Sequence, residues 1–351
     1  MIFQQSLYQT YQRYRSLKTH RITSLPIAIL MPHSACNCRC VMCDIWKDNK
    51  NLKQLTEEDV KGLLTSLSRL GTKQVLMSGG EALLNANFFR LCELLKKQNI
   101  HITLLSTGLL LKKNADQLVE FVDDVIVSLD GDENVHDAIR NISGAYAKLK
   151  EGVNCVKSVN PLYRITSRTV IHKLNFRNWS SIIDSAKEMG IDQVSFLPAD
   201  VSSAAFNREI PWTSERQLEV AIDANELGEL KAVIDDLLIR HKHHFESRFI
   251  AESPEKIMKI YTYYAAINGL SEFPYKKCNA PWVSTVVEAD GSVRPCFFHA
   301  SFGNIRQDSL LGILNGRKGM QFRKELNMEK NETCKRCVCY LNLSAWVNPV
   351  K

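Results

Sequence analysis

The 351-residue sequence lacks any uninterrupted apolar run near the roughly 20 residues that a membrane-spanning helix needs. Its longest apolar candidate, residues 25–31, has the length of a strand. Residues 1–21 also lack the apolar core and the small-residue cleavage site of a secretion signal. These absences predict a soluble, cytoplasmic protein that does not enter a membrane.

Long runs of like charge are absent as well. The formal net charge is +7 and charged residues make up 24% of the chain, but the lysines and arginines are spread along the sequence. The sequence therefore gives no clear nucleic-acid-binding patch. A moderately basic surface is still suited to an anionic cofactor, a nucleotide-like substrate or an acidic partner protein.

Cysteine, by contrast, is abundant for a chain without a secretion signal. Nine of the eleven cysteines fall in two regions of the chain, namely Cys36, Cys38, Cys40 and Cys43, then Cys278, Cys296, Cys334, Cys337 and Cys339. In a reducing compartment such clustering favours metal ligation over disulfides. The remaining two, Cys92 and Cys155, fall inside helical patterns, which is typical of small core residues.

Between residues 25 and 200, short apolar strands alternate with amphipathic helices. Six strands are expected, each but the last followed by a helix, at residues 26–31, 74–77, 101–105, 124–129, 164–171 and 193–197. This order predicts a parallel sheet with right-handed crossovers. Because a full eight-fold barrel usually needs about 250 residues, we expect an α/β fold with a partial (β/α)6 TIM-type barrel.

Four parts are expected along the chain. They are an N-terminal extension, the partial barrel, a helical connector and a small C-terminal domain with the second group of cysteines, at residues 1–24, 25–200, 201–277 and 278–351. The connector contains a histidine-rich stretch, residues 241–247. We interpret this stretch as a solvated helix face, because a metal site there has only Glu246 as an acidic neighbour.

The first group of cysteines follows directly after the first expected strand. Cys36, Cys40 and Cys43 are separated by three and then two residues. Three thiolates at this spacing can hold three irons of a cubane iron-sulfur cluster and leave the fourth iron open to a ligand. Zinc is the alternative, since two thiols separated by two residues are common in zinc sites. Cys38 or His33 would then complete its coordination.

A glycine-rich turn, Ser78-Gly-Gly-Glu81, follows the second expected strand. Two adjacent glycines let backbone groups approach a bound amino acid closely. Ser106 and Ser128 likewise stand where the third and fourth strands end. All of these residues belong to the C-terminal rim of the expected barrel, where parallel α/β folds build their active sites.

The spacing Cys36-x3-Cys40-x2-Cys43, with the glycine-rich turn one helix later, resembles the radical SAM superfamily. The resemblance implies a [4Fe-4S] cluster whose open iron chelates the amino and carboxylate groups of S-adenosylmethionine (SAM). One electron then cleaves SAM reductively to a 5′-deoxyadenosyl radical, which abstracts hydrogen from a substrate. A flavodoxin or ferredoxin-type donor of that electron is implied as well.

The resemblance also assigns residues to the SAM site. The glycine-rich turn would contact the SAM amino group, two serines would line the site, and the planar fork of an arginine would meet the carboxylate. The candidate SAM-binding residues are Gly79, Gly80, Glu81, Ser106, Ser128 and Arg168. By residue type alone, the serines also fit ordinary turns and the arginine fits an ion pair. The segment from Val127 to Gly131 with His136 to Arg140 resembles the family too.

In the second group, Cys278 and Cys296 flank a strand and an Asp-Gly turn, and Cys334-Lys-Arg-Cys337 follows. The turn can fold the first part into a hairpin, and four thiolates can ligate a cluster completely. The pattern resembles the SPASM/twitch extension of radical SAM enzymes and implies one auxiliary [4Fe-4S] cluster in electron transfer. Zinc remains the alternative, and Cys339 competes with Cys337 as a ligand.

These motifs predict a radical SAM enzyme, an oxidoreductase or a related enzyme, that acts on a small molecule. Residues 1–25 are expected to be too short for the leader-peptide-binding domain of many peptide-modifying relatives. The alternative is a peptide or protein maturase that forms thioether or carbon-carbon crosslinks, with leader recognition supplied by another protein. A different class, a non-catalytic iron-sulfur or zinc protein, predicts no SAM cleavage after reduction by dithionite.

Overall fold

A nine-stranded sheet organises the chain in the computed structural model, which describes residues 7–205, 207–208 and 210–350. Its strand order is β6-β5-β4-β3-β2-β1-β7-β8-β9. The first six strands are parallel, in the order predicted: β1 (Ile27–His33), β2 (Gln74–Gly79), β3 (His101–Ser106), β4 (Asp124–Ser128), β5 (Arg164–Ile171) and β6 (Gln193–Pro198). The predicted partial (β/α)6 barrel is therefore confirmed.

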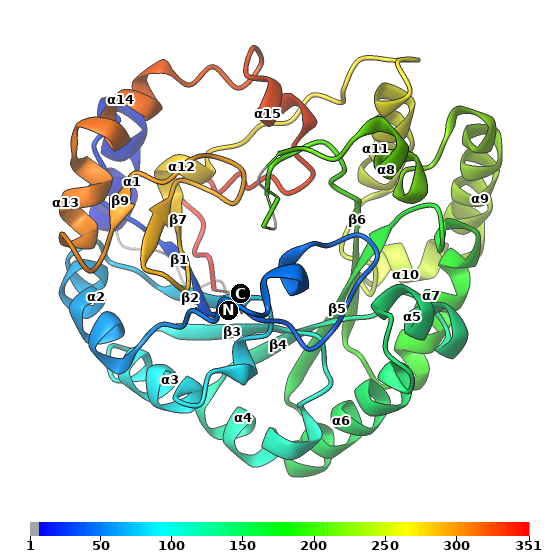
Figure 1. Cartoon of the computed structure of the whole chain (residues 1–351), viewed down its shortest axis with the longest axis horizontal. Helices are drawn as coiled ribbons and strands as arrows, with labels where there is room; N and C mark the ends of the chain where they lie inside the picture. The colour runs from blue at the N-terminus through cyan, green and yellow to red at the C-terminus, as the bar shows by residue number, and fades with distance from the viewer. Residues whose placement is uncertain (1–6, 206, 209, 351) are drawn as a thin grey trace.

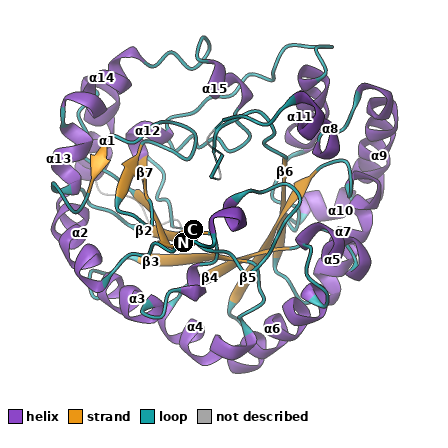
Figure 2. Cartoon of the chain, viewed as in Figure 1, coloured by secondary structure: helices purple, strands orange, loops and turns teal. Residues whose placement is uncertain are grey.

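Helices cover the outer side of the curved sheet (Figures 1 and 2). In chain order they are α2 (Glu57–Arg69), α3 (Phe88–Lys96), α4 (Ala115–Phe121), α5 (Glu133–Arg140), α6 (Ala145–Val159) and α7 (Trp179–Glu188). Helix α2 illustrates why they form. A reciprocal capping box joins Thr56 and Asp59 at its N-terminus, and Val60, Leu63 and Leu67 recur at helical spacing and are buried.

The expected connector is largely helical. It contains α8 (Ser214–Val220), α9 (Leu227–Arg240), α10 (Lys242–Glu246) and α11 (Pro254–Ile267). Two tyrosines of α11 fix this helix to the C-terminal rim of the barrel, because the hydroxyl of Tyr263 donates to the carbonyl of Ala199 and that of Tyr264 to the carbonyl of Ile171. The connector therefore packs where the last two strands end.

The histidine-rich stretch is only in part the solvated face that we predicted, since Lys242, His243, Glu246 and Ser247 are exposed. His241 and His244 are buried, and their Nδ1 atoms lie 3.0 Å apart. His241 also bonds to the hydroxyl of Ser180, and His244 packs against Phe249. Local sequence polarity gave no sign of this packing, because both partners come from outside the stretch.

The C-terminal residues extend the barrel sheet. Strand β7 (Ser284–Val287) pairs in parallel with β1, and β8 (Ser292–Arg294) and β9 (Gly303–Asn304) continue in antiparallel fashion. The expected hairpin is thus formed by β7 and β8. Around these strands lie α12 (Ala280–Val283), α13 (Leu310–Asn315), α14 (Arg317–Glu325) and α15 (Glu332–Arg336), with α1 (Leu7–Thr19) beside them (Figure 1).

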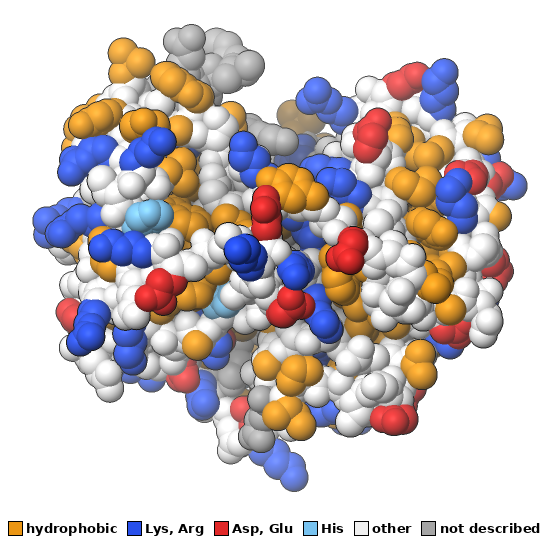
Figure 3. Space-filling view, turned by 90° about the horizontal axis from the view of Figure 1, so that it is seen from above, with side chains coloured by type: hydrophobic (Ala, Val, Ile, Leu, Met, Phe, Trp, Pro, Cys, Tyr) orange, Lys and Arg blue, Asp and Glu red, His pale blue; other side chains and the backbone are white. Residues whose placement is uncertain are grey.

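Among the described residues, none of the helices has the length and apolar character required to cross a membrane. On the face drawn in Figure 3, lysine and arginine side chains lie among acidic, apolar and uncharged ones rather than in one tract. That distribution agrees with the scattered basic residues of the sequence.

Candidate metal and cofactor sites

The loop after β1 brings the thiols of Cys36, Cys40 and Cys43 close enough to affect one another. Cys36 is influenced by the charge of Cys40, and Cys43 by the charges of both. Burial raises the pKa of Cys36 and that of Cys43 to about 12. Three desolvated thiols therefore lie near one another in this loop. Such thiols become ligands when a metal ion stabilises their anionic form.

Cys38 is buried inside the same loop. Its thiol is hydrogen bonded to Cys40, and this bond is the main reason why the pKa of Cys40 is lowered, to about 6. The pKa of Cys38 itself is raised by the same bond and by burial. Cys38 thus supports the neighbouring sulfur in this arrangement.

Arg140 holds the cysteine loop in two ways, neither of which was predictable from the sequence. Its Nη1 donates to the sulfur of Cys40 at 3.4 Å, and its Nη2 pairs with the fully buried carboxylate of Asp130 at 2.5 Å. The main-chain carbonyls of Arg140 and Ile139 accept hydrogen bonds from Arg39 and Val41, both at 3.0 Å. The end of α5 is therefore a support for the cysteine loop.

The glycine-rich turn lies against the chain that leads into this loop. The N–H of Glu81 donates to the carbonyl of Ala35 at 2.8 Å, and that of Gly80 donates to the carbonyl of His33 at 3.3 Å. A Cβ atom at Gly80 would lie 2.1 Å from the carbonyl oxygen of Ala35. Only glycine permits this approach, so the turn and the cysteine loop form one unit.

Glu81 and Ser106, two of the six predicted SAM-binding residues, bond to each other. The buried carboxylate of Glu81 accepts from the hydroxyl of Ser106 at 3.0 Å, and from the N–H and hydroxyl of Thr107 at 2.8 and 2.7 Å. Burial raises the pKa of Glu81, while these donors lower it. The network ties the glycine-rich turn to the end of β3.

Ser128 and Arg168 belong to a row of polar side chains that crosses β4, β5 and β6. Ser128 of β4 stands opposite Arg168 of β5, which stands opposite Ser195 of β6. Directly paired residues project to the same face of a sheet, and the Nε of Arg168 donates to the hydroxyl of Ser195 at 3.4 Å. Sequence reasoning missed Ser195, whose only signal was its place near a strand end.

Arg208, Trp212 and Arg216 of the connector lie against the cysteine loop. The indole N–H of Trp212 donates to the carboxylate of Asp44 at 2.7 Å, and the guanidinium carbons of Arg208 and Arg216 lie 3.9 and 4.6 Å from the centre of its ring. Arg216 also donates to the carbonyl of Val41. The sequence carried no signal for these contacts, which join residues far apart in the chain.

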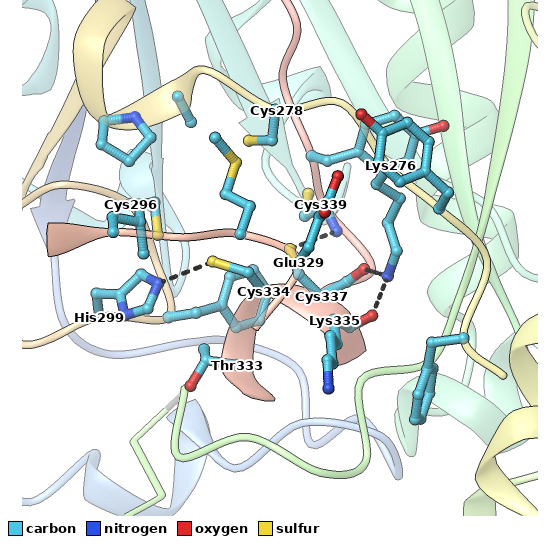
Figure 4. A pocket seen from close by; sticks show the side chains of 18 of the residues that line it. Lys276, Cys278, Cys296, His299, Glu329, Thr333, Cys334, Lys335, Cys337 and Cys339 are labelled. Carbon is cyan, nitrogen blue, oxygen red and sulfur yellow. Dashed lines mark hydrogen bonds between the residues drawn. The ribbon is translucent and has the colours of Figure 1, made fainter. Parts of the chain in front are cut away.

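The second group of cysteines lines a cavity of about 210 Å³ (Figure 4). All five of its thiols belong to the lining, namely those of Cys278, Cys296, Cys334, Cys337 and Cys339. The N–H of Cys339 donates to the sulfur of Cys337 at 3.4 Å, and the Nε2 of His299 lies 3.4 Å from the sulfur of Cys334. Cys339 is exposed, whereas Cys337 is half-buried.

A cubane cluster suits this cavity better than a zinc ion does. Zinc draws four thiolates to about 2.3 Å from one point, whereas the five thiols here line the wall of a cavity of about 210 Å³. A cubane distributes its ligands over separate irons. Thiols spaced around an open cavity match that second arrangement.

A neighbouring cavity of about 270 Å³ joins the barrel rim to the second cysteine group. Asp200 and Ser203, which follow β6, line one side, and Arg336 of α15 also belongs to the lining. The two cavities share Phe298, Thr333 and Cys337. The two cavities are therefore neighbours that share part of their walls.

Comparison with known proteins gives matches over both cysteine regions. Residues 30–186 match the radical SAM superfamily, and residues 278–338 match an iron-sulfur cluster-binding domain, SPASM. The first region holds the β1 cysteine loop with the glycine-rich turn. The second holds four of the five C-terminal cysteines.

Curated relatives are similar over most of the chain. The Fe-coproporphyrin III synthase of Methanosarcina barkeri (strain Fusaro / DSM 804) is 24% identical over 331 residues, which cover 89% of this chain and 80% of that protein. The sporulation killing factor maturation protein SkfB of Bacillus subtilis (strain 168) is 23% identical over 325 residues, which cover 91% of this chain and 71% of that protein.

A solved structure is similar in fold. The crystal structure of Streptococcus suis SuiB bound to precursor peptide SuiA matches with a TM-score of 0.64 and 15% identity, over 98% of this chain and 80% of that chain. At 15% identity, the likeness to this structure shows the fold alone.

Proposed function

Because this chain belongs to the radical SAM superfamily and carries a SPASM domain, we propose that Cys36, Cys40 and Cys43 bind the SAM-cleaving [4Fe-4S] cluster of an enzyme that modifies a small molecule. That cluster, when bound, supplies the electron that cleaves SAM. The observation that carries the proposal is the meeting of three thiols, one buried and two half-buried, beside the Gly79–Gly80 turn at the end of β1 and β2.

The chain's own residues then have distinct tasks toward SAM. The side-chain-free backbone of Gly79 and Gly80 would let the amino acid part of SAM lie close to the cysteine loop, and Glu81 with Ser106 holds that turn in place. Arg168 offers a planar fork for the SAM carboxylate, with Ser128 beside it in register. Glu81 and Ser106 act in this scheme by positioning the turn.

For the auxiliary cluster we propose the ligands Cys278, Cys296, Cys334 and Cys337. The hydrogen bond from the Cys339 N–H to the Cys337 sulfur supports Cys337 as the ligand and Cys339 as the residue that stabilises it. The auxiliary cluster would exchange electrons with the substrate. A flavodoxin or ferredoxin-type protein would be the external electron donor.

The cavity between the rim and the second cysteine group is our candidate substrate site. Asp200, Ser203 and Arg336 give it polar and charged groups, which suit a small polar molecule. Similarity to an Fe-coproporphyrin III synthase favours a small-molecule substrate. Similarity to SkfB and to peptide-bound SuiB favours the second candidate, a peptide or protein maturase.

SAM cleavage tests the proposed activity. The chain is reconstituted with iron and sulfide without oxygen, reduced with dithionite and given SAM, and 5′-deoxyadenosine is measured by mass spectrometry. The wild type and the control Cys155→Ala should form it, whereas Cys36→Ala and Cys43→Ala should not. Equal product from all four proteins, or none from the wild type, would refute the proposal.

Binding measurements separate the two substrate candidates. Fe-coproporphyrin III is titrated into the SAM-loaded protein and its absorption spectrum is followed, with Arg336→Gln as the variant in the candidate site. A spectral shift that saturates and weakens in Arg336→Gln favours the small molecule. A matching set of titrations with a short cysteine-rich peptide would give the stronger response if the chain is a maturase.

A further inference from the structure

Lys276 is a half-buried cation in the wall of the cavity that holds the five C-terminal thiols (Figure 4). Its Nζ donates to the carbonyls of Lys335 and Cys337 at 2.6 and 2.5 Å. These two carbonyls belong to the segment that carries the Cys334 and Cys337 thiols. The side chain of Lys276 thus fastens the segment from inside the cavity.

The ammonium group has no carboxylate partner among the residues that the structure describes. Glu272 and Glu329 line the same cavity, but neither forms an ion pair with Lys276. Partial burial lowers the pKa of Lys276, and the negative charge of the Cys337, Cys334 and Cys278 thiols opposes that shift. A cavity wall that carries an ammonium group without a carboxylate partner suits an anionic occupant.

Two of the three N–H donors of the ammonium are used by the carbonyls. Within the described part of the chain no third acceptor is bound. The remaining donor and the full positive charge are therefore available to whatever the thiols hold. A thiolate-bound iron-sulfur cluster is negative, and reduction makes it more so. A nearby cation stabilises the reduced form most, which raises the reduction potential.

We propose that Lys276 is a positioning residue of the auxiliary site that fastens the Cys334–Cys337 segment and makes the auxiliary cluster easier to reduce. This inference rests on the proposed function, since it needs a cluster at Cys278, Cys296, Cys334 and Cys337. Lys277, its exposed neighbour in sequence, forms no such contacts among the described residues and supplies a matched control.

The test isolates the auxiliary cluster in a full-length parent with Cys36, Cys40 and Cys43 replaced by alanine. Lys276→Met, Lys276→Arg and Lys277→Met are made in this parent. Iron per chain is counted, and the midpoint potential is measured by redox titration followed by electron paramagnetic resonance. Neither readout depends on turnover. Thermal unfolding of each apoprotein checks that the fold is kept.

Lys276→Met should lower the midpoint potential by at least 59 mV, which is a tenfold change in the reduction equilibrium. The midpoint potentials of Lys276→Arg and Lys277→Met should stay near that of the parent. Loss of iron from Lys276→Met alone would also support the fastening role. Equal potentials in Lys276→Met and Lys277→Met would overturn the inference while leaving the cluster proposal intact, whereas a parent without iron would overturn both.

Discussion

The guanidinium of Arg140 donates a hydrogen bond of 3.4 Å to the sulfur of Cys40, across 100 residues of sequence. The same guanidinium neutralises Asp130, a carboxylate without solvent exposure. Removing one member of a buried ion pair leaves the other charge uncompensated. Arg140 therefore links the stability of the barrel rim to the position of one proposed cluster ligand.

The variant Arg140→Met should destabilise the apoprotein by about 3–5 kcal/mol, because it leaves the Asp130 carboxylate buried and unpaired. The double variant Asp130→Asn with Arg140→Met should recover much of that loss. Urea unfolding followed by circular dichroism measures both. An Arg140→Met protein as stable as the wild type would show that the ion pair does not support the rim.

Gly80→Ala should disrupt the packing of the glycine-rich turn against the cysteine loop. The added Cβ would meet the carbonyl oxygen of Ala35 at 2.1 Å, a backbone atom that cannot move aside freely. We expect a loss of about 1–3 kcal/mol in stability and weaker SAM binding by equilibrium dialysis. Gly62→Ala is the control, since nothing lies within 4 Å of its Cβ and alanine favours a helix. Similar behaviour of the two variants would contradict this role.

The buried histidine His136 should make the apoprotein sensitive to acid. Burial and the charge of Arg140 lower its pKa from 6.5 to about 3. Between these two pH values the unfolded chain binds a proton that the folded chain does not, so stability falls as pH falls below 6.5. Thermal unfolding should show a smaller fall from pH 7 to pH 5 in His136→Gln than in the wild type. If the stability of the two proteins falls equally between pH 7 and pH 5, His136 is not a source of the acid sensitivity.

Cys339→Ser should keep the auxiliary cluster, and Cys337→Ser should lose it. The exposed Cys339 contributes its backbone N–H to the Cys337 sulfur, and serine retains that donor. Iron counting in the parent without the first three cysteines distinguishes the two variants. The reverse result would make Cys339 the ligand.

The barrel was predictable because its strands are short apolar runs that alternate with amphipathic helices, as residues 74–77 and α2 illustrate. The two groups of cysteines were predictable from their spacing. Pairing of β7 with β1, the hold of Arg140 on Cys40 and the cover that Trp212 forms over Asp44 were not. Each of these joins segments 100 or more residues apart, and local periodicity does not report which distant partner a residue meets. The burial of His241 and His244 was not predictable either, because their partners Ser180 and Phe249 lie outside the histidine-rich stretch.

The central proposal is that Cys36, Cys40 and Cys43, and not Cys38, hold the first cluster. The most direct measurement is the electron paramagnetic resonance spectrum of the dithionite-reduced chain before and after SAM is added, in the wild type, Cys38→Ala and Cys40→Ala. We predict that SAM changes the spectrum of the wild type and of Cys38→Ala, and that Cys40→Ala gives no such response. A response that survives in Cys40→Ala and disappears in Cys38→Ala would contradict the account.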